Sequence, residues 1–415
     1  MSSKMILMLG MCGLMVVMAS AQAQGELMVA DETAAASAAG ATERAAGLHF
    51  GPLQVIPELN ASYFHDSNPT YAEEHSKGVT GYRVEPILDF ILTGNGWTAD
   101  LRGWFSQQHY FGSSTNVNRV ADQNYGENAS FAYVTPQDTK ITFNESYQYW
   151  NGNSFVAANG PSGMYNASFG DRQLFTSGGE IDTALGEKTR MHAGVSYSDL
   201  WYDNPALFGW QDVGGSLGFS HKLSDISDAL LDFGADNQTS DGGSDGDSQS
   251  YRALAGFGSR LTPKTSYKAE VGLMGYQFNN GSKSAVAPTY SLSGVWEISE
   301  RLSAHVSGSS AYQPSESDTN NYTVVDILST GLTFKPIRRL TTTLDATYRR
   351  ESYGISTAAG EKRHDNQADL SSRATYRVYH YTDLFVGAEF CRNASSIDNN
   401  SYSRLYLETG VDIRF

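Results

Sequence analysis

Residues 405–415 read Leu-Tyr-Leu-Glu-Thr-Gly-Val-Asp-Ile-Arg-Phe, and their side chains alternate between two kinds. The odd-numbered positions are apolar apart from one threonine, and the even-numbered positions are polar, charged or small. Successive side chains of a β-strand point to opposite faces of the sheet. This stretch therefore predicts a strand that has hydrocarbon on one face and a hydrated space on the other.

The strand closes on an aromatic residue, Phe415. Such an ending is similar to the carboxy-terminal signal by which bacterial outer-membrane barrels are recognised for assembly. We therefore expect an assembly signal formed by Tyr406, Val411, Ile413 and Phe415, with the barrel assembly machinery as the partner that reads it.

The same alternation recurs upstream, in residues 53–64, 84–90, 97–105, 191–197, 267–273 and 340–348. Gly94-Asn95-Gly96 separates two of these stretches, as expected for a hairpin turn. Short connections also alternate with long polar ones along the chain, which is typical of outer-membrane barrels with short periplasmic turns and long extracellular loops. The sequence predicts an all-β fold, a single closed antiparallel transmembrane barrel of about eighteen strands.

Composition narrows the alternatives. None of the internal segments of this 415-residue chain approaches eighteen consecutive apolar residues, which excludes a helical membrane protein. A mean hydropathy of -0.38 is compatible with a barrel, because a barrel strand gives only half of its residues to lipid. A secreted propeller or solenoid is the soluble alternative, but it needs bulky inward residues where this pattern has small and charged ones.

The amino terminus predicts export. Lys4, an apolar core over residues 5–18 and small residues at 19–23 form a signal peptide, residues 1–23, with cleavage after Ala23. Residues 24–47 form an Ala-rich periplasmic leader and residues 48–415 the barrel. Cleavage removes Lys4, so the net charge becomes -16 - 1 = -17. Cys391 is then the one cysteine left, which excludes an intramolecular disulfide.

The opening strand carries a resemblance. Gly51-Pro52-Leu53-Gln54-Val55-Ile56-Pro57-Glu58-Leu59, followed by Tyr63-Phe64-His65-Asp66-Ser67-Asn68, resembles the first strand of the putative β-barrel porin family 2. His65 departs from the aromatic or acidic residue common at that position. The resemblance implies an outer-membrane barrel, often found beside exopolysaccharide genes, without a settled biochemical activity.

A barrel of this size leaves a water-filled channel, and the alternation predicts which charges line it. The predicted acidic lumenal residues are Glu58, Glu85, Asp89, Asp100, Glu180, Asp182, Asp232, Glu270, Glu297, Asp345, Asp369, Glu389, Glu408 and Asp412. The predicted basic ones are Arg102, Arg252, Arg260, Lys268, Arg349, Arg373, Arg377 and Arg414. Acids are in excess, so we expect a preference for cations.

Three further hypotheses concern the lumen and loops. Arg349, Arg373 and Arg377 gather on late strands, where they either oppose the early acids across the lumen or form ordinary cross-strand pairs. The long loop 151–170 either folds inward as a constriction or lies outward. The acidic loop 240–247 offers oxygen ligands for Ca²⁺ but lacks the distal glutamate of an EF-hand, which favours a solvated turn.

Function follows from the barrel rather than from a catalytic motif. The histidines are scattered and none of them lies in a nucleophile-like motif such as Gly-x-Ser-x-Gly, so we expect no enzyme, no cofactor and no metal. The leader is too short for the plug of a TonB-type transporter. Passive diffusion of small hydrophilic solutes is the preferred interpretation, with polysaccharide export or a non-conducting structural or surface-interaction barrel as alternatives. The expected partners are outer-membrane lipid and lipopolysaccharide, and no nucleic acid is expected.

Overall fold

The computed structural model describes residues 47–69, 78–111, 121–151, 171–203, 209–241, 247–278, 284–314, 322–356, 362–396 and 401–415. The predicted signal peptide, the leader up to residue 46, and most of the loops 151–170 and 240–247 lie outside these residues. In the described part of the chain, no helix is long and apolar enough to cross a membrane.

The described residues form strands throughout. In chain order the strands are β1 (Leu48–Phe50), β2 (Leu53–Asp66), β3 (Val79–Gly94), β4 (Trp97–Phe111), β5 (Ala121–Val134), β6 (Lys140–Trp150), β7 (Arg172–Ala184), β8 (Thr189–Tyr202), β9 (Trp210–Ser224), β10 (Ser227–Ser240), β11 (Ser248–Thr262), β12 (Thr265–Phe278), β13 (Ser284–Ser299), β14 (Leu302–Pro314), β15 (Tyr322–Ile337), β16 (Leu340–Ser356), β17 (Lys362–Tyr379), β18 (Thr382–Ser395) and β19 (Tyr402–Arg414).

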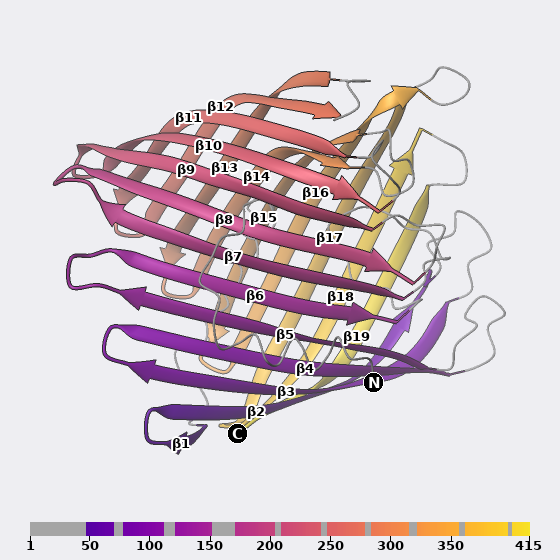
Figure 1. Ribbon diagram of the computed structural model, residues 1–415. Helices are drawn as coiled ribbons and strands as arrows, with labels where there is room; N and C mark the ends of the chain where they lie inside the picture. The colour runs from indigo at the N-terminus through magenta and orange to yellow at the C-terminus, as the bar shows by residue number, and fades with distance from the viewer. Residues whose placement is uncertain are drawn as a thin grey trace, which may run out of the picture.

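Each strand from β2 onward pairs antiparallel with the next, and β19 pairs with β2 to close the ring. The short β1 is an extra strand that pairs with β2 alone among the described strands. The prediction of an all-β closed antiparallel barrel of about eighteen strands is therefore confirmed (Figure 1). Closure pairs the first barrel strand with the last, so neither is a free edge strand, as a strand wall in hydrocarbon requires.

All the short hairpin turns lie at one end of the barrel, on the left in Figure 1. The turn between β3 and β4 has Gly96 at φ 79°, a left-handed conformation that favours glycine and suits a tight hairpin. The register of closure pairs Arg414 with Glu58 and Tyr406 with Asp66. The Phe415 N–H adds a bond to the Pro57 carbonyl at 3.0 Å, so the last residue is fixed against the first barrel strand.

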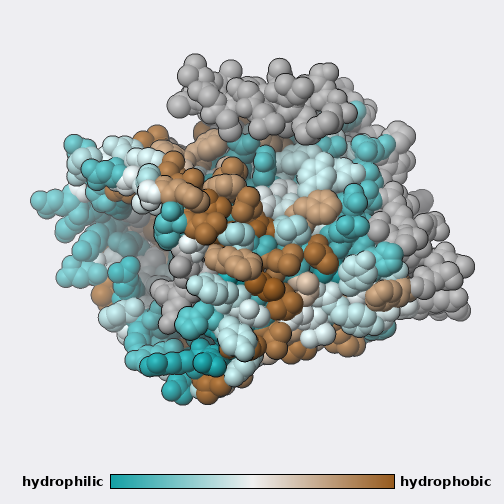
Figure 2. Space-filling model, turned by 90° about the horizontal axis from the view of Figure 1, so that it is seen from below, coloured by the Kyte–Doolittle hydropathy of each residue, from teal (hydrophilic) through white to brown (hydrophobic). Residues whose placement is uncertain are grey.

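The two faces of the wall differ in their side chains. Large apolar residues such as Leu101, Phe131 and Leu217 are exposed on the outer face. On the wall seen from below, hydrophobic side chains gather in the middle and hydrophilic ones gather toward the end with the short turns (Figure 2). On β19, Val411 and Ile413 share the outward face with exposed Leu405 and Leu407, while Tyr406 faces inward.

The inward face is less uniformly polar than the sequence pattern predicts. Phe64, Leu254, Met274 and Phe278 are buried at inward positions. Phe64 belongs to one apolar cluster, and Met274 and Phe278 belong to another, both near the strand ends that precede the long loops. Bulky inward residues thus fill part of the barrel, and the charged wall lies between them and the short turns.

Candidate lumenal site

The structure places every predicted acidic and basic lumenal residue on the face opposite the exposed apolar side chains of its strand. On β19, for example, Glu408 and Asp412 alternate with Leu405 and Leu407. The assignment of these residues to a conducting pore remains a prediction. What the structure adds is how they contact one another, and many of these contacts belong to two clusters on opposite sides of the ring.

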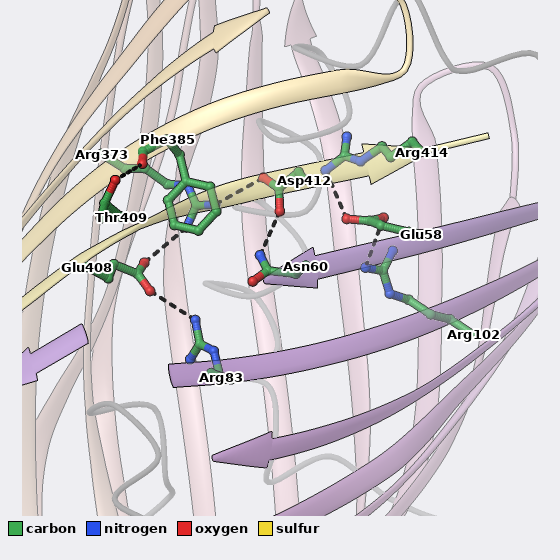
Figure 3. A network of polar contacts seen from close by, with 10 residues as sticks. All are labelled: Glu58, Asn60, Arg83, Arg102, Arg373, Phe385, Glu408, Thr409, Asp412 and Arg414. Atoms are coloured by element: carbon green, nitrogen blue, oxygen red, sulfur yellow. Dashed lines mark hydrogen bonds and ion pairs between the residues drawn. The ribbon is translucent and has the colours of Figure 1, made fainter. Parts of the chain in front are cut away.

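The first cluster crosses the closure of the barrel and is here called the seam network (Figure 3). Arg373 of β17 contacts two carboxylates of β19, with Nη1 at 3.1 Å from Glu408 Oε1 and Nη2 at 3.1 Å from Asp412 Oδ2. Its guanidinium also lies over the ring of Phe385, 3.6 Å from the centroid, which fixes the plane of the fork. Arg373 is therefore held by groups on two strands, β18 and β19.

The same carboxylates connect β19 to the first strands. Arg83 Nη2 of β3 lies 2.9 Å from Glu408 Oε2, and Asn60 Nδ2 of β2 donates to Asp412 Oδ1 at 2.6 Å. Each carboxylate thus accepts from both sides of the closure through its two oxygens. Charge-assisted bonds of this kind are stronger than neutral ones.

The seam network continues toward the short turns. Glu58 of β2 lies between two arginines, 3.2 Å from Arg414 Nη2 and 3.7 Å from Arg102 Nη2. Arg102 also donates to Asp89 Oδ2 at 3.2 Å. The network thus combines four arginines with four carboxylates, and its formal charges cancel. The members are Arg83, Arg102, Arg373, Arg414, Glu58, Asp89, Glu408 and Asp412.

The hypothesis that late arginines oppose early acids across the lumen is wrong. Arg373 is linked through Glu408 to Arg83, next to the early acids, because β17 lies only three strands from β2 around the closure. Arg377 pairs with Asp383 at 3.3 Å and Arg349 with Glu351 at 2.7 Å. The arginines form local cross-strand and same-strand pairs, which was the other interpretation of the pattern.

A buried ion pair reinforces the closure closer to the long-loop end. Arg404 of β19 is 4% exposed, and its Nη2 lies 2.8 Å from Asp66 Oδ2 of β2, whose side chain is 5% exposed. Arg404 Nε donates to the same oxygen at 3.0 Å, and Nη1 lies 3.4 Å from Glu389 Oε1. Phe64 and Tyr406 stack beside it with ring centroids 5.7 Å apart. Charge and packing both hold β19 to β2 here.

The second cluster, here called the β10 cluster, lies halfway around the ring, since nine strand steps separate β10 from β19 in either direction. His192 Nε2 lies 2.6 Å from Asp232 Oδ1. Lys268 Nζ bridges Asp232 at 3.4 Å and Glu270 at 2.9 Å. With a neutral histidine the β10 cluster has a net charge of one negative, whereas the seam network is neutral. The net charges on these two sides of the lumen therefore differ by one.

Both clusters depend on a glycine that lets side chains meet across an intervening strand. Gly218 of β9 is the register partner of both His192 on β8 and Asp232 on β10. A Cβ at Gly218 would collide with the His192 ring and with the Asp232 carboxylate. Gly387 of β18 occupies the same position between Arg373 and Glu408. The pairs His192–Asp232 and Arg373–Glu408 therefore each skip a strand at a glycine.

Among the predicted acids, Asp369 accepts a hydrogen bond from Gln367 Nε2 at 2.7 Å, and three others take part in none of the ion pairs between described residues. They are Glu85 on β3, Glu180 on β7 and Glu297 on β13. Each faces inward by the alternation of its strand. Carboxylates outside the ion pairs are cancelled less completely than paired ones, so they contribute to the field along the lumen.

Sequence reasoning missed Arg83, His192 and Arg404 as lumenal residues. His192 lies within the alternating stretch 191–197 and Arg83 directly precedes the stretch 84–90, so applying the face assignment to these two positions would have found them. Arg404 lies just before the last eleven residues and is an inward position of the same strand. Its burial against Asp66 depends on the closing register, which the alternation does not specify.

Comparison with known families finds one match. Residues 234–415 match the family model described as Putative beta-barrel porin 2. The resemblance seen in the sequence is thus confirmed over these residues, although residues 51–68, which carried it, lie outside the match. Over these residues the chain is similar to a family of β-barrel porins. None of the curated protein sequences matches the chain.

Several solved structures are similar in shape to this chain. OccAB4 of Acinetobacter baumannii is 10% identical, covers 88% of this chain and 99% of its own, and has a TM-score of 0.49. The FrpB iron transporter from Neisseria meningitidis (F5-1 variant) is 9% identical, with coverages of 89% and 83% and a TM-score of 0.49. The outer membrane protein OpdK from Pseudomonas aeruginosa is 9% identical, with coverages of 87% and 99% and a TM-score of 0.46.

Proposed function

We propose, from the match of residues 234–415 to this porin family, that the protein is an outer-membrane channel through which small hydrophilic solutes diffuse passively, with a preference for cations. The observation that carries the proposal is a closed ring of eighteen strands whose inward wall is charged on opposite sides, at the seam network and the β10 cluster. Barrels of sixteen to eighteen strands are wide enough for an aqueous channel. Export by the amino-terminal signal peptide and the absence of catalysis belong to the same proposal.

The cation preference is proposed from the acids that take part in no ion pair. The seam network is neutral, so its fixed charges largely cancel at the distance of a passing ion. Glu85, Glu180 and Glu297 are not cancelled in this way and attract cations to the wall. Selectivity is thus assigned to a few uncompensated carboxylates rather than to the whole acidic excess.

The test is electrical. The purified protein, reconstituted in planar bilayers, should give stable conductance steps, with a reversal potential under a salt gradient that indicates cation preference. Folded protein that gives no steps would refute the channel, and an anion-directed reversal potential would refute the cation preference.

Replacing the three uncompensated acids should move selectivity. We expect Glu85→Gln, Glu180→Gln and Glu297→Gln together to shift the reversal potential toward zero, because each removes one negative charge from the lumenal wall. The matched control is Glu127→Gln with Glu145→Gln, two acids at outward positions of β5 and β6. The control should leave the reversal potential unchanged. An equal shift in both variants would contradict the assignment of selectivity to the lumen.

A further inference from the structure

The barrel wall is split on one side, between β13 and β14. Their register runs from Ser299 opposite Leu302 to Ser291 opposite Ser309 and stops there. Both strands nevertheless continue, since β13 stays paired with β12 up to Ser284 and β14 stays paired with β15 up to Pro314. Two strand segments, residues 284–290 and 310–314, are therefore neighbours in the ring without a ladder between them.

A proline explains why the ladder ends. The N–H of Glu297 points toward β12, where it donates to the Lys264 carbonyl. Backbone N–H groups alternate in direction along a strand, so nine residues away the nitrogen of Pro288 points toward β14. Proline has no N–H to donate there. In sheets proline is confined to edges and bulges, and Pro288 makes this side of β13 an edge.

The end of β14 then passes along the lumenal side of β13. In a continued ladder Tyr312 would lie on the outward face, because every second residue of a strand shares a face. Ala304 and Gly308 are on that face, since they pair with the exposed Leu332 and Leu328 of β15. Instead, the Tyr312 N–H donates to Met274 Sδ at 3.3 Å, and the Tyr312 ring lies 5.2 Å from that of Tyr276. Both partners are inward residues of β12, two strands away.

Side chains take over bonds that a continued ladder would make. Thr289 Oγ1 donates to the Ser310 carbonyl at 2.7 Å. That carbonyl is the acceptor that the Tyr290 N–H would use if the register continued, since the pairs would run Tyr290 with Ser310 and Thr289 with Ala311. The split is therefore closed by one hydroxyl and by packing of Tyr312 on Met274, Tyr276 and Phe278 rather than by backbone bonds.

Proline alone does not split a barrel wall. Pro86 interrupts the ladder between β3 and β4, where Val84 pairs with Gln107 and pairing is next seen at Ile87 with Trp104. The ladder is intact on both sides of that interruption and extends to Thr80 opposite Phe111. The β3–β4 interruption is a local irregularity, whereas the β13–β14 ladder does not resume.

We propose that the split between β13 and β14 is a lateral portal that admits the acyl chain of a membrane lipid from the bilayer into the lumen. The outer surface beside the split is apolar and unusually exposed, with Val271 at 69%, Leu273 at 62% and Val286 at 73%. The inner surface beside it is the apolar cluster of Met274, Tyr276, Phe278 and Tyr312. An acyl chain that crosses the wall here meets apolar side chains on both sides.

The occupant follows from the surroundings. The wall of a barrel in a membrane is covered by lipid, so hydrocarbon chains are the molecules present at the outer side of the split. Opening requires the loss of the Thr289 bond and movement of one packed strand end, because no backbone ladder has to be broken there. Elsewhere in the ring, an opening would break consecutive backbone bonds, each costing several kcal/mol in hydrocarbon.

Photo-crosslinking tests the portal without measuring transport, so its failure is distinguishable from failure of the channel. The photoreactive residue p-benzoylphenylalanine replaces Met274, and folded protein is irradiated in vesicles of phosphatidylethanolamine and phosphatidylglycerol. We expect a phospholipid adduct by mass spectrometry. The matched control is Ile87, an inward residue of β3 beside Pro86, and the positive control is outward Val286.

The expected pattern is an adduct at Met274 and Val286 and at least tenfold less at Ile87. An adduct at Val286 alone would overturn the proposal, and equal adducts at Met274 and Ile87 would overturn it by showing general access of lipid to the lumen. If the Met274 variant does not fold, Tyr276, which is closer in shape to the probe, takes its place. Pro288→Ala, which restores an N–H toward β14, should reduce the Met274 adduct several-fold.

Discussion

Replacing Arg404 with methionine is expected to lower the free energy of unfolding by about 3–5 kcal/mol, because it leaves a buried charge without its partner. Asp66 is almost fully buried and both of its bonds from Arg404 would be lost, at 2.8 and 3.0 Å. Glu389 would lose its contact at 3.4 Å as well. Methionine keeps most of the volume of the side chain, so the loss is one of charge rather than of packing.

Urea unfolding of the refolded protein in detergent micelles, followed by the gel mobility difference between folded and unfolded barrel, measures this effect. Arg190→Met is the matched control, since Arg190 is 39% exposed and contacts Asp138 and Asp182 near a short turn. An exposed pair of this kind contributes about 0–1 kcal/mol. Equal losses in the two variants would show that burial of Arg404 is not what gives the pair its effect.

A double replacement separates the two sources of the loss. Arg404→Met with Asp66→Leu removes both charges, so we expect most of the stability lost in Arg404→Met to return. If the double variant is as unstable as the single one, the bonds themselves rather than the stranded carboxylate stabilise the closure. Either result bears on how β19 is held to β2, the one pairing in the ring between strands at opposite ends of the chain.

The sequence was sufficient for the architecture because a barrel is built from one local rule. Side-chain direction alternates along every strand, so residues such as Glu58 and Glu408 could be assigned to the inward face without knowing their neighbours. Strand number followed from the alternation of short and long connections. Neither step requires a tertiary contact, and both survive errors of one or two residues at the strand ends.

The contacts within the lumen required information that the alternation lacks. Which residues of β17, β18 and β19 lie side by side depends on register, and the link from Arg373 to Glu408 also depends on Gly387 between them. The sequence analysis also did not predict the bulky side chains that pack inside the barrel, because their packing depends on where the ladders end. Tyr312 has the parity of an outward residue, and only the end of the ladder at Ser291 explains why it packs on Met274.

Gly218→Val is expected to destabilise the barrel by about 3–5 kcal/mol, from overpacking and the loss of a charge-assisted bond. The new side chain would occupy the space over β9 through which His192 and Asp232 meet at 2.6 Å. Asp232 would also be displaced from Lys268, so the whole β10 cluster would rearrange. Valine is well suited to strands, which removes strand propensity as the cause of the loss.

Gly258→Val on β11 provides the matched control. Gly258 also faces the lumen, but a Cβ there would meet only ordinary contacts, the nearest being Leu230 Cδ1 at 3.5 Å. We expect the free energy of unfolding of this variant to lie within about 1 kcal/mol of that of the parent protein in the same urea assay, because substitutions away from close contacts have small effects. Similar losses at both glycines would mean that any lumenal glycine is needed for backbone reasons. A loss confined to Gly218 would mean that the glycine is required because two charged side chains meet above it.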